Sequence, residues 1–222
     1  LGTPCRQQMA RKIAGWVRQP ERDAPWATLT GGAVHNLMED VLPHWNKRIG
    51  TERWLAEGEV SDGFEVSGHS DAYDAEYQMV VDWKYTDFQA KKLREAKRKG
   101  LPVRDQVSQD YRIQAHIYGY MQDRVGRPVK WVRIVFFGRT ANLLRDSEEW
   151  TEEWNPDIAI WALDRYYSLV DTIGPDDTER EAKVLSVPIA PERHTCQWCP
   201  FFVPHIQPSR AGCPGITTTA GA

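Results

Sequence analysis

The sequence predicts a mixed α/β fold with its elements in the order ααβββααβα. Three observations support this prediction. Apolar residues recur at helical spacing in two segments before residue 50, short alternating runs broken by glycine occupy residues 53–86, and a β-branched and aromatic run fills residues 129–137. No internal repeat and no low-complexity tract interrupts this order.

Two helices are expected at the start of the chain. Residues 5–18 form the first, and its apolar positions are Met9, Ile13, Trp16 and Val17. Thr30 is a residue type that caps helices, so the second helix is expected from Thr30 to about Ile49. Its apolar stripe comprises Val34, Leu37, Met38, Val41, Leu42 and Trp45. Pro43 lies inside this segment, where proline kinks or splits a helix.

Three antiparallel strands are expected next, over residues 53–86. Gly58, the Asp62-Gly63 pair and Gly68 divide this segment into short runs, the last of which covers residues 78–84. The remaining predicted elements are a basic helix that stops at Gly100, a helix over residues 106–122, a buried strand over 129–137 and a helix over 156–170.

The composition is that of a globular protein. The chain has 222 residues, of which 41% are hydrophobic and 27% charged, so it can bury a sizeable core. Its longest apolar stretches, such as residues 134–137, are far shorter than the roughly 20 residues that a membrane-spanning helix needs. We therefore expect no membrane partner.

The formal net charge of −3 argues against a basic field over the whole surface. A local patch exists between residues 91 and 104, where Glu95 is the single acidic residue before the last arginine. The cations of this patch, which are the candidate DNA-binding residues, are Lys91, Lys92, Arg94, Lys97, Arg98, Lys99 and Arg104. A charge run of this kind is also typical of a solvated helix face.

The four cysteines form an uneven pattern. Cys5 stands near the start, and Cys196, Cys199 and Cys213 lie near the end, with two and then thirteen residues between them. Two disulfides are disfavoured, because no secretory feature is visible and a chain of this size needs no such cross-links. A four-thiolate zinc site and an iron–sulfur cluster both remain open, and His194 and His205 could also serve as zinc ligands.

Acidic residues and a lysine fall on two neighbouring predicted strands. Asp82 and Lys84 are two residues apart, so they project from the same face of a strand, and Asp71 lies on the strand before them. If the hairpin register places Asp71 beside Asp82, two carboxylates and an ammonium group converge. Such a set binds Mg²⁺ or Mn²⁺ and favours phosphodiester hydrolysis. The alternative is a hairpin with solvent-facing charges.

This constellation resembles the PD-(D/E)XK nuclease superfamily and, within it, the RecB-like exonucleases. Asp71 matches the first acidic motif and Asp82-Trp83-Lys84 the D/E-x-K motif. His35 matches the helical histidine that precedes them, and Gln114 with Tyr118 matches the Q-x-x-x-Y motif. The lone early cysteine and the late Cys-x-x-Cys-Pro-Phe run resemble the iron–sulfur subgroup, which includes the AddB nuclease domain and CRISPR-associated adaptation nucleases.

The resemblance implies a restriction-endonuclease-like core, with a central mixed sheet flanked by helices and with both termini joined by a metal cluster. It implies one nuclease domain over residues 1–222, with a core at about 30–172 and a cysteine-ligated lobe of 1–29 and 173–222. His35, Asp71, Asp82 and the backbone carbonyl of Trp83 would hold the Mg²⁺ or Mn²⁺ ion.

The resemblance also implies catalytic roles. Lys84 would act in catalysis with the two aspartates, and Gln114 and Tyr118 would position the lysine or a DNA phosphate. Cys5, Cys196, Cys199 and Cys213 would ligate a [4Fe–4S] cluster.

The expected activity is metal-dependent exonuclease cleavage of single-stranded DNA or duplex ends, in recombination, repair or phage DNA metabolism. No G-x-x-x-x-G-K-[ST] motif occurs, so unwinding would come from a helicase or recombination partner. We expect a cytoplasmic protein, bacterial or phage-encoded. The competing interpretation is a non-catalytic DNA-binding or assembly module stabilised by a four-cysteine zinc or iron–sulfur site.

Overall fold

The structure is a computed structural model that describes residues 3, 5–16, 25–138, 146–175, 178–189, 196 and 199–215. The chain divides into two compact units. One spans residues 24–160, and the other combines residues 1–23 with residues 161–222.

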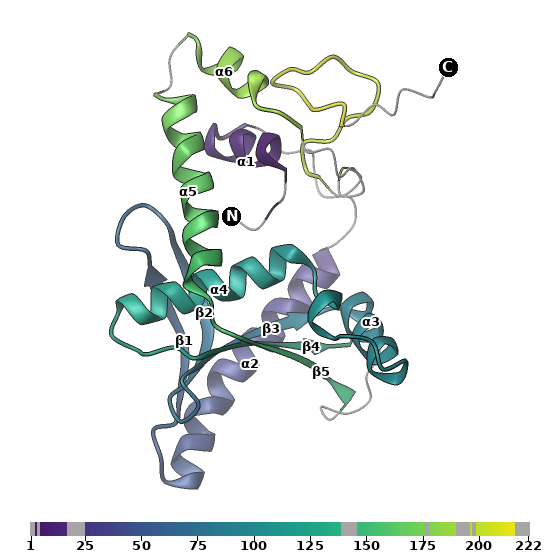
Figure 1. Cartoon of the computed structure of the whole chain (residues 1–222). Coiled ribbons are helices and arrows are strands. Elements are labelled where there is room, and N and C mark those ends of the chain that lie inside the picture. Colours follow the sequence, from purple (N-terminus) through teal and green to yellow (C-terminus); the bar gives the residue numbers. More distant parts are fainter. Residues whose placement is uncertain are drawn as a thin grey trace. The chain divides into compact units, whose positions relative to one another are not determined.

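A five-stranded mixed sheet forms the centre of the unit of residues 24–160 (Figure 1). The strands lie in sequence order, and they are β1 (Trp54–Ser61), β2 (Ser67–Asp74), β3 (Met79–Tyr85), β4 (Trp131–Phe137) and β5 (Glu148–Glu153). Strands β1, β2 and β3 pair antiparallel, β3 and β4 pair parallel, and β4 and β5 pair antiparallel. The parallel pair needs a long crossover, which the helices between β3 and β4 supply.

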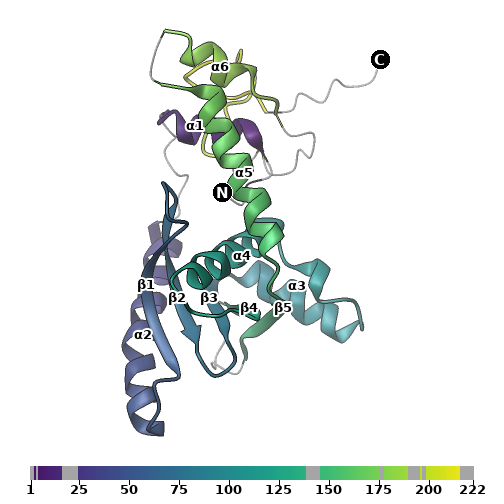
Figure 2. The same ribbon diagram turned by 60° about the vertical axis from the view of Figure 1, so that its left-hand side comes forward.

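Helices cover both faces of this sheet. Helix α2 (Pro25–Ile49) lies on one side of the strands, and α3 (Asp87–Arg98) and α4 (Gln109–Arg124) lie on the other (Figure 2). A short 3₁₀ turn, η1 (Arg104–Gln106), connects α3 to α4. The predicted mixed α/β fold, with a central mixed sheet flanked by helices, is confirmed.

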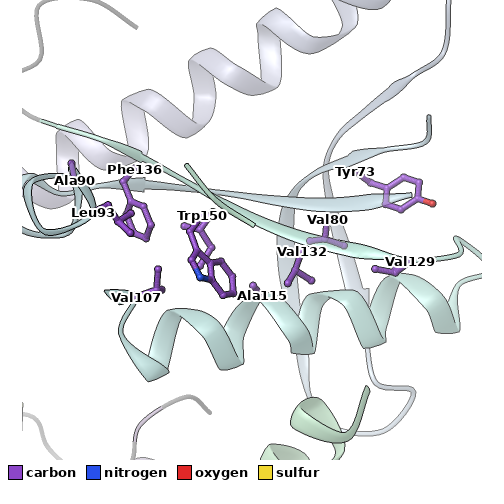
Figure 3. Packing of buried hydrophobic residues seen from close by; sticks show 11 residues of the cluster. Tyr73, Val80, Ala90, Leu93, Val107, Ala115, Val129, Val132, Phe136 and Trp150 are labelled. Carbon is purple, nitrogen blue, oxygen red and sulfur yellow. The ribbon is translucent and has the colours of Figure 1, made fainter. Parts of the chain in front are cut away.

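Each face of the sheet has its own hydrophobic core. Val80 of β3 packs towards α3 and α4 with Leu93, Phe136 and Trp150 (Figure 3). The alternate residues of β3, including Val81 and Trp83, pack with α2 on the opposite face. Because side chains alternate along a strand, Asp82 and Lys84 lie on the α4 side of the sheet, like Val80.

Helix α2 starts at Pro25, earlier than the sequence predicted, and continues through Pro43 to Ile49. An interior proline costs about 3 kcal/mol or more of helix stability. Contacts with the sheet offset this cost, since Leu42 is buried in the core and the side chain of Asn46 makes two hydrogen bonds to the backbone of Trp54, at 2.6 and 2.9 Å. Of the two outcomes expected at Pro43, a kink or a split, the split is therefore wrong.

The other unit contains α1 (Arg6–Ile13), residues 161–173 of helix α5 (Pro156–Ile173) and α6 (Arg180–Ser186). Its core joins the two ends of the chain, because Met9 and Trp16 pack with Leu169, Val184 and Phe201. The carboxyl-terminal loop is held by a bridge between Phe202 and Cys213.

Two elements were missing from the prediction. Strand β5 reads Glu-Glu-Trp-Thr-Glu-Glu, and its central Trp150 is the only fully buried side chain in it, so its sequence lacks an apolar strand pattern. Helix α6 has seven residues, too few for a clear helical periodicity. The first helix ends at Ile13, and residues 17 and 18 of the predicted span lie outside the described residues. None of the helices in the described ranges combines the length and apolar character that a bilayer crossing requires.

Candidate active site

The candidate site begins where β2 and β3 stop pairing. The last paired residues are Ala72 and Val81, so Asp71 and Asp82 stand opposite each other one step further along. At this step the side chain of Asp71 takes the place of a backbone acceptor between the strands, because its Oδ2 accepts a hydrogen bond of 2.7 Å from the backbone N–H of Trp83. The register that the sequence left open therefore brings the two carboxylates together.

Asp82 and Lys84 form a buried ion pair on this face. The ammonium Nζ of Lys84 donates to Oδ1 of Asp82 at 2.8 Å and lies 2.7 Å from Oδ2. Only 2% of the Asp82 side chain and 17% of the Lys84 side chain are exposed. The pair is thus shielded from water. In the protein interior the mutual attraction of two charges is strongest, and their loss of hydration is also most costly.

Burial changes the proton affinity of both partners. Desolvation raises the pKa of Asp82 to about 6, and the charge of Lys84 offsets only part of this effect. Desolvation lowers the pKa of Lys84, but the nearby charge of Asp82 outweighs it and leaves that pKa raised. The first shift disfavours the ionised pair and the second favours it. The shift at Asp82 has the firmer physical basis, since its carboxylate is the more deeply buried group.

Helix α2 contributes a histidine to the same point. Nδ1 of His35 lies 3.2 Å from Oδ1 of Asp71, and 31% of the histidine side chain is exposed. The hydrogen bond to Asp71 raises the pKa of His35, with burial acting in the opposite direction. Asp71 therefore has one oxygen on His35 and the other on the backbone of Trp83.

Helix α4 lines the site with the predicted Gln114 and Tyr118. Their spacing of four residues places them on one helical face, where Nε2 of Gln114 donates to the hydroxyl of Tyr118 at 3.1 Å. Tyr118 senses the charges of Asp82, Lys84 and Asp71, although burial is the main cause of its raised pKa.

Two further residues of the site were not predicted. The ring of Tyr111 lies 5.6 Å from Nζ of Lys84, in a cation–π arrangement. A Cβ atom at Gly68 would come within 3.2 Å of the Tyr118 ring, so glycine is what allows the strand to approach that tyrosine. A signal for Tyr111 did exist, since it precedes Gln114 by three residues and so shares its helical face.

The donor atoms of the site suit a hard divalent cation by their chemistry. Oδ2 of Asp82 is buried and has no hydrogen-bond partner among the described residues, despite the close Lys84 ammonium. Within the described residues, however, no group of three His, Cys, Asp or Glu side chains stands ready to hold a metal ion. At this site the two carboxylates contact Lys84, His35 and the Trp83 N–H.

The predicted basic segment divides into two groups. Arg94 and Lys97 of α3 both pair with Glu148, at 3.0 and 2.8 Å, and Arg104 pairs with Glu152 at 2.7 Å. The other four cations form no ion pair with the described residues, and they are Lys91, Lys92, Arg98 and Lys99. Part of the predicted patch is therefore neutralised by the edge strand β5.

The four cysteines gather in the other unit. Cys5, Cys196, Cys199 and Cys213 line one small cavity. Burial raises the pKa of the Cys199 and Cys213 thiols, and the charges of the neighbouring cysteines add to this effect. The structure thus brings the lone early cysteine into one cavity with the three late ones, but these side chains do not form a ready-made metal-binding group.

Comparisons with known proteins give little further guidance. No protein-family model matches the chain, and no curated protein sequence is significantly similar to it. Among solved structures, the chain is similar to a phage-related exonuclease from Haemophilus somnus 129PT, with a TM-score of 0.47 and 13% sequence identity. The similarity covers 74% of this chain and 77% of that protein.

Proposed function

We propose that the chain is a metal-dependent deoxyribonuclease of the PD-(D/E)XK superfamily, an exonuclease acting on single-stranded DNA or DNA ends. One observation carries this proposal. Four separate elements, α2, β2, β3 and α4, bring His35, Asp71, Asp82, Lys84 and the Gln114–Tyr118 pair to one place. A solvent-facing hairpin, the alternative from the sequence, is incompatible with the burial of Asp82 and Lys84.

The residues that would hold Mg²⁺ or Mn²⁺ are His35, Asp71, Asp82 and the backbone carbonyl of Trp83. When bound, the ion would polarise a phosphate oxygen and lower the pKa of a water molecule. Oδ2 of Asp82 supports this assignment, because it is a buried carboxylate oxygen whose contact in the protein is the ion pair with Lys84, without a hydrogen bond of good geometry, and a cation could take the place of that contact.

The protein's own groups have distinct roles in this proposal. Lys84 would orient the attacking water and neutralise charge on the phosphate, with its own position held by Asp82 and the Tyr111 ring. Gln114 fixes the Tyr118 hydroxyl, which would then position Lys84 or a DNA phosphate. Asp71 orients His35 through the hydrogen bond between them.

The substrate class follows from charge and accessibility. The cations of α3 that form no ion pair with the described residues would contact backbone phosphates, which gives salt-sensitive binding without sequence preference. The proposal also includes unwinding by a helicase or recombination partner. It further includes a role in recombination, repair or phage DNA metabolism and a location in the bacterial cytoplasm.

The same proposal includes a [4Fe–4S] cluster on Cys5, Cys196, Cys199 and Cys213. The donor set supports a metal centre, because Cys5 lines one cavity with three cysteines from the other end of the chain. A backbone N–H group also faces one of the sulfur atoms, since Gln8 N–H lies 3.5 Å from the sulfur of Cys5. Such donors stabilise ligating thiolates.

The test is digestion of end-labelled single- and double-stranded DNA by anaerobically purified protein, with Mn²⁺, Mg²⁺ or EDTA. We expect metal-dependent loss of label with the wild type and with Lys130→Ala, an exposed lysine outside the site, but not with Lys84→Ala. Release of mononucleotides from one labelled end would establish exonuclease action and its polarity. Absence of cleavage by folded wild type would reject the proposal in favour of a DNA-binding or assembly module.

A further inference from the structure

Arg11 of helix α1 is a buried cation next to the cysteines. Only 1% of its surface is exposed, and it lines the same cavity as Cys5, Cys196, Cys199 and Cys213. Its Nη1 donates to the carbonyl oxygen of Ser209 at 2.9 Å, and its guanidinium lies over the ring of Trp16 at 4.8 Å. Its Nε and Nη2 atoms have no hydrogen-bond partner in the described part of the chain.

An arginine in this position is costly unless a negative charge lies beside it. Burying an unpaired cation is among the most unfavourable events in folding, and the guanidinium stays protonated. No carboxylate of the described residues forms an ion pair with Arg11. Burial lowers the pKa of Arg11, and the groups that oppose this effect are Cys213, Cys199 and Cys5, which line its cavity and would carry negative charge when ionised.

A metal-bound set of cysteines supplies that charge. Metal ligation requires the thiolate form, and four thiolates around a zinc ion or a cubane cluster leave a net negative charge. Neutral thiols would leave the two unpartnered N–H groups of Arg11 facing weak acceptors. The buried arginine therefore requires a nearby negative charge, and metal-bound cysteines in the same cavity would supply it.

We infer that Arg11 is the internal counter-cation of the four-cysteine metal centre, a positioning residue that neutralises part of the thiolate charge through its free Nε and Nη2 donors. This inference rests on the proposed cluster. It assigns Arg11 a task distinct from anchoring the loop, for which the bond from Nη1 to Ser209 suffices. Two consequences follow: the positive charge slows loss of the metal, and it raises the reduction potential of the centre.

Two substitutions separate charge from anchoring. Arg11→Lys keeps the charge but loses the planar group that donates to Ser209, whereas Arg11→Gln keeps a hydrogen-bond donor and loses the charge. Arg210→Gln is the matched control, because Arg210 is an exposed arginine of the same loop. All variants are purified anaerobically as the full chain, and iron, sulfide and zinc are counted per chain.

The readouts are the rate of metal loss to an excess of chelator and, for an iron-containing centre, a spectroscopically followed reduction titration. We expect at least tenfold faster loss for Arg11→Gln, with Arg11→Lys and Arg210→Gln near the wild type. We also expect the reduction equilibrium of Arg11→Gln to move at least tenfold against reduction, which is about 59 mV for a one-electron couple.

Other results would overturn the inference in recognisable ways. Wild-type loss rates and potential in Arg11→Gln would show that the charge is not used. Faster loss in Arg11→Lys but not in Arg11→Gln would assign Arg11 an anchoring role only. A wild-type protein that carries no metal would reject the proposed cluster itself and the inference with it, whereas a zinc-containing protein would reject the cluster alone, with the loss rates still deciding the role of Arg11.

Discussion

The chain contains two centres of buried charge, and they are balanced in opposite ways. In the carboxylate site, every buried charge has an opposite charge beside it, since Lys84 pairs with Asp82 and His35 pairs with Asp71. In the cysteine cavity, the buried Arg11 has no carboxylate partner among the described residues, and its Nε and Nη2 are unsatisfied. The first centre is electrostatically complete without a metal, and the second is not.

This difference indicates different roles for the two proposed metals. A divalent cation at the carboxylate site has to displace existing interactions, so it can bind and leave while the fold persists. A metal at the cysteine cavity would complete a core in which α1 packs with the carboxyl-terminal loop, so its loss would expose that core. We therefore expect a catalytic metal in one unit and a structural metal in the other.

The largest expected effect concerns activity. Lys84→Ala and Asp82→Ala should each lower the rate of DNA cleavage by about 1000-fold or more, because each removes a group that acts on the reacting phosphate or holds the metal. Circular dichroism should show an unchanged fold, with Lys130→Ala as the control. Cleavage that survives both substitutions would remove this site from the proposed mechanism.

The next effect concerns folding. Cys199→Ser should lose the bound metal and destabilise the protein by about 3 kcal/mol or more, since structural metal sites contribute folding free energy directly. Thermal unfolding and limited proteolysis of the purified protein would measure this loss, while treatment of the wild type with EDTA should stop cleavage and leave the unfolding transition near its original temperature. A stable, metal-free and active Cys199→Ser variant would contradict the structural role.

A smaller effect concerns pH. The pKa of Asp82 is raised to about 6, and a proton on this carboxylate competes with a metal ion. The affinity for Mn²⁺ should therefore be constant only well above pH 6, and at lower pH it should fall by up to about tenfold per pH unit for each ligand that takes up a proton. The raised pKa of His35 acts in the same direction, because only neutral imidazole binds metal. Calorimetric titration at several pH values checks this, and an affinity independent of pH between 5 and 7 would oppose it.

The smallest effect concerns DNA binding. Substituting Arg98 and Lys99 by alanine should weaken binding and lower the slope of log K against log salt by roughly 1 for each phosphate that is no longer neutralised. Substituting Arg94 and Lys97 should change the slope less, since both are already engaged with Glu148. Fluorescence anisotropy over a range of salt concentrations measures both pairs. Equal slopes for all variants would identify α3 as a solvated face.

The fold was predictable where local patterns and packing agree. The alternating runs over residues 53–86 and the apolar run at 129–137 became β1 to β4, because their side chains fill the two cores of the sheet. Strand β5 was not predictable, since only Trp150 reaches a core and its partner β4 decides its conformation. The domain limits, the DNA-binding residues and the identity of the cluster remain predictions.

The site was predictable in its residues and less so in its arrangement. Residue types and spacing pointed to His35, Asp71, Asp82, Lys84, Gln114 and Tyr118, and the structure places all of them together. Gly68 and Tyr111 were not predicted, because their roles depend on contacts with Tyr118 and Lys84 that exist only in the folded chain. Arg11 was not predicted for the same reason, because it is one of many arginines in the chain and its helix carries no distinctive motif.

The groups available for chemistry follow from the amino-acid sequence alone: two acids and a lysine on neighbouring strands, a glutamine and a tyrosine on one helical face, and four cysteines. Spacing of this kind is local, so it can be read from the periodicities of helices and strands. Three further properties appear only in the folded chain: the register that places Asp71 opposite Asp82, the burial that raises the pKa of Asp82, and the position of Arg11 beside the cysteines. Those properties depend on contacts between residues far apart in the chain, and exclusion of water from such contacts exists only once the whole core has packed.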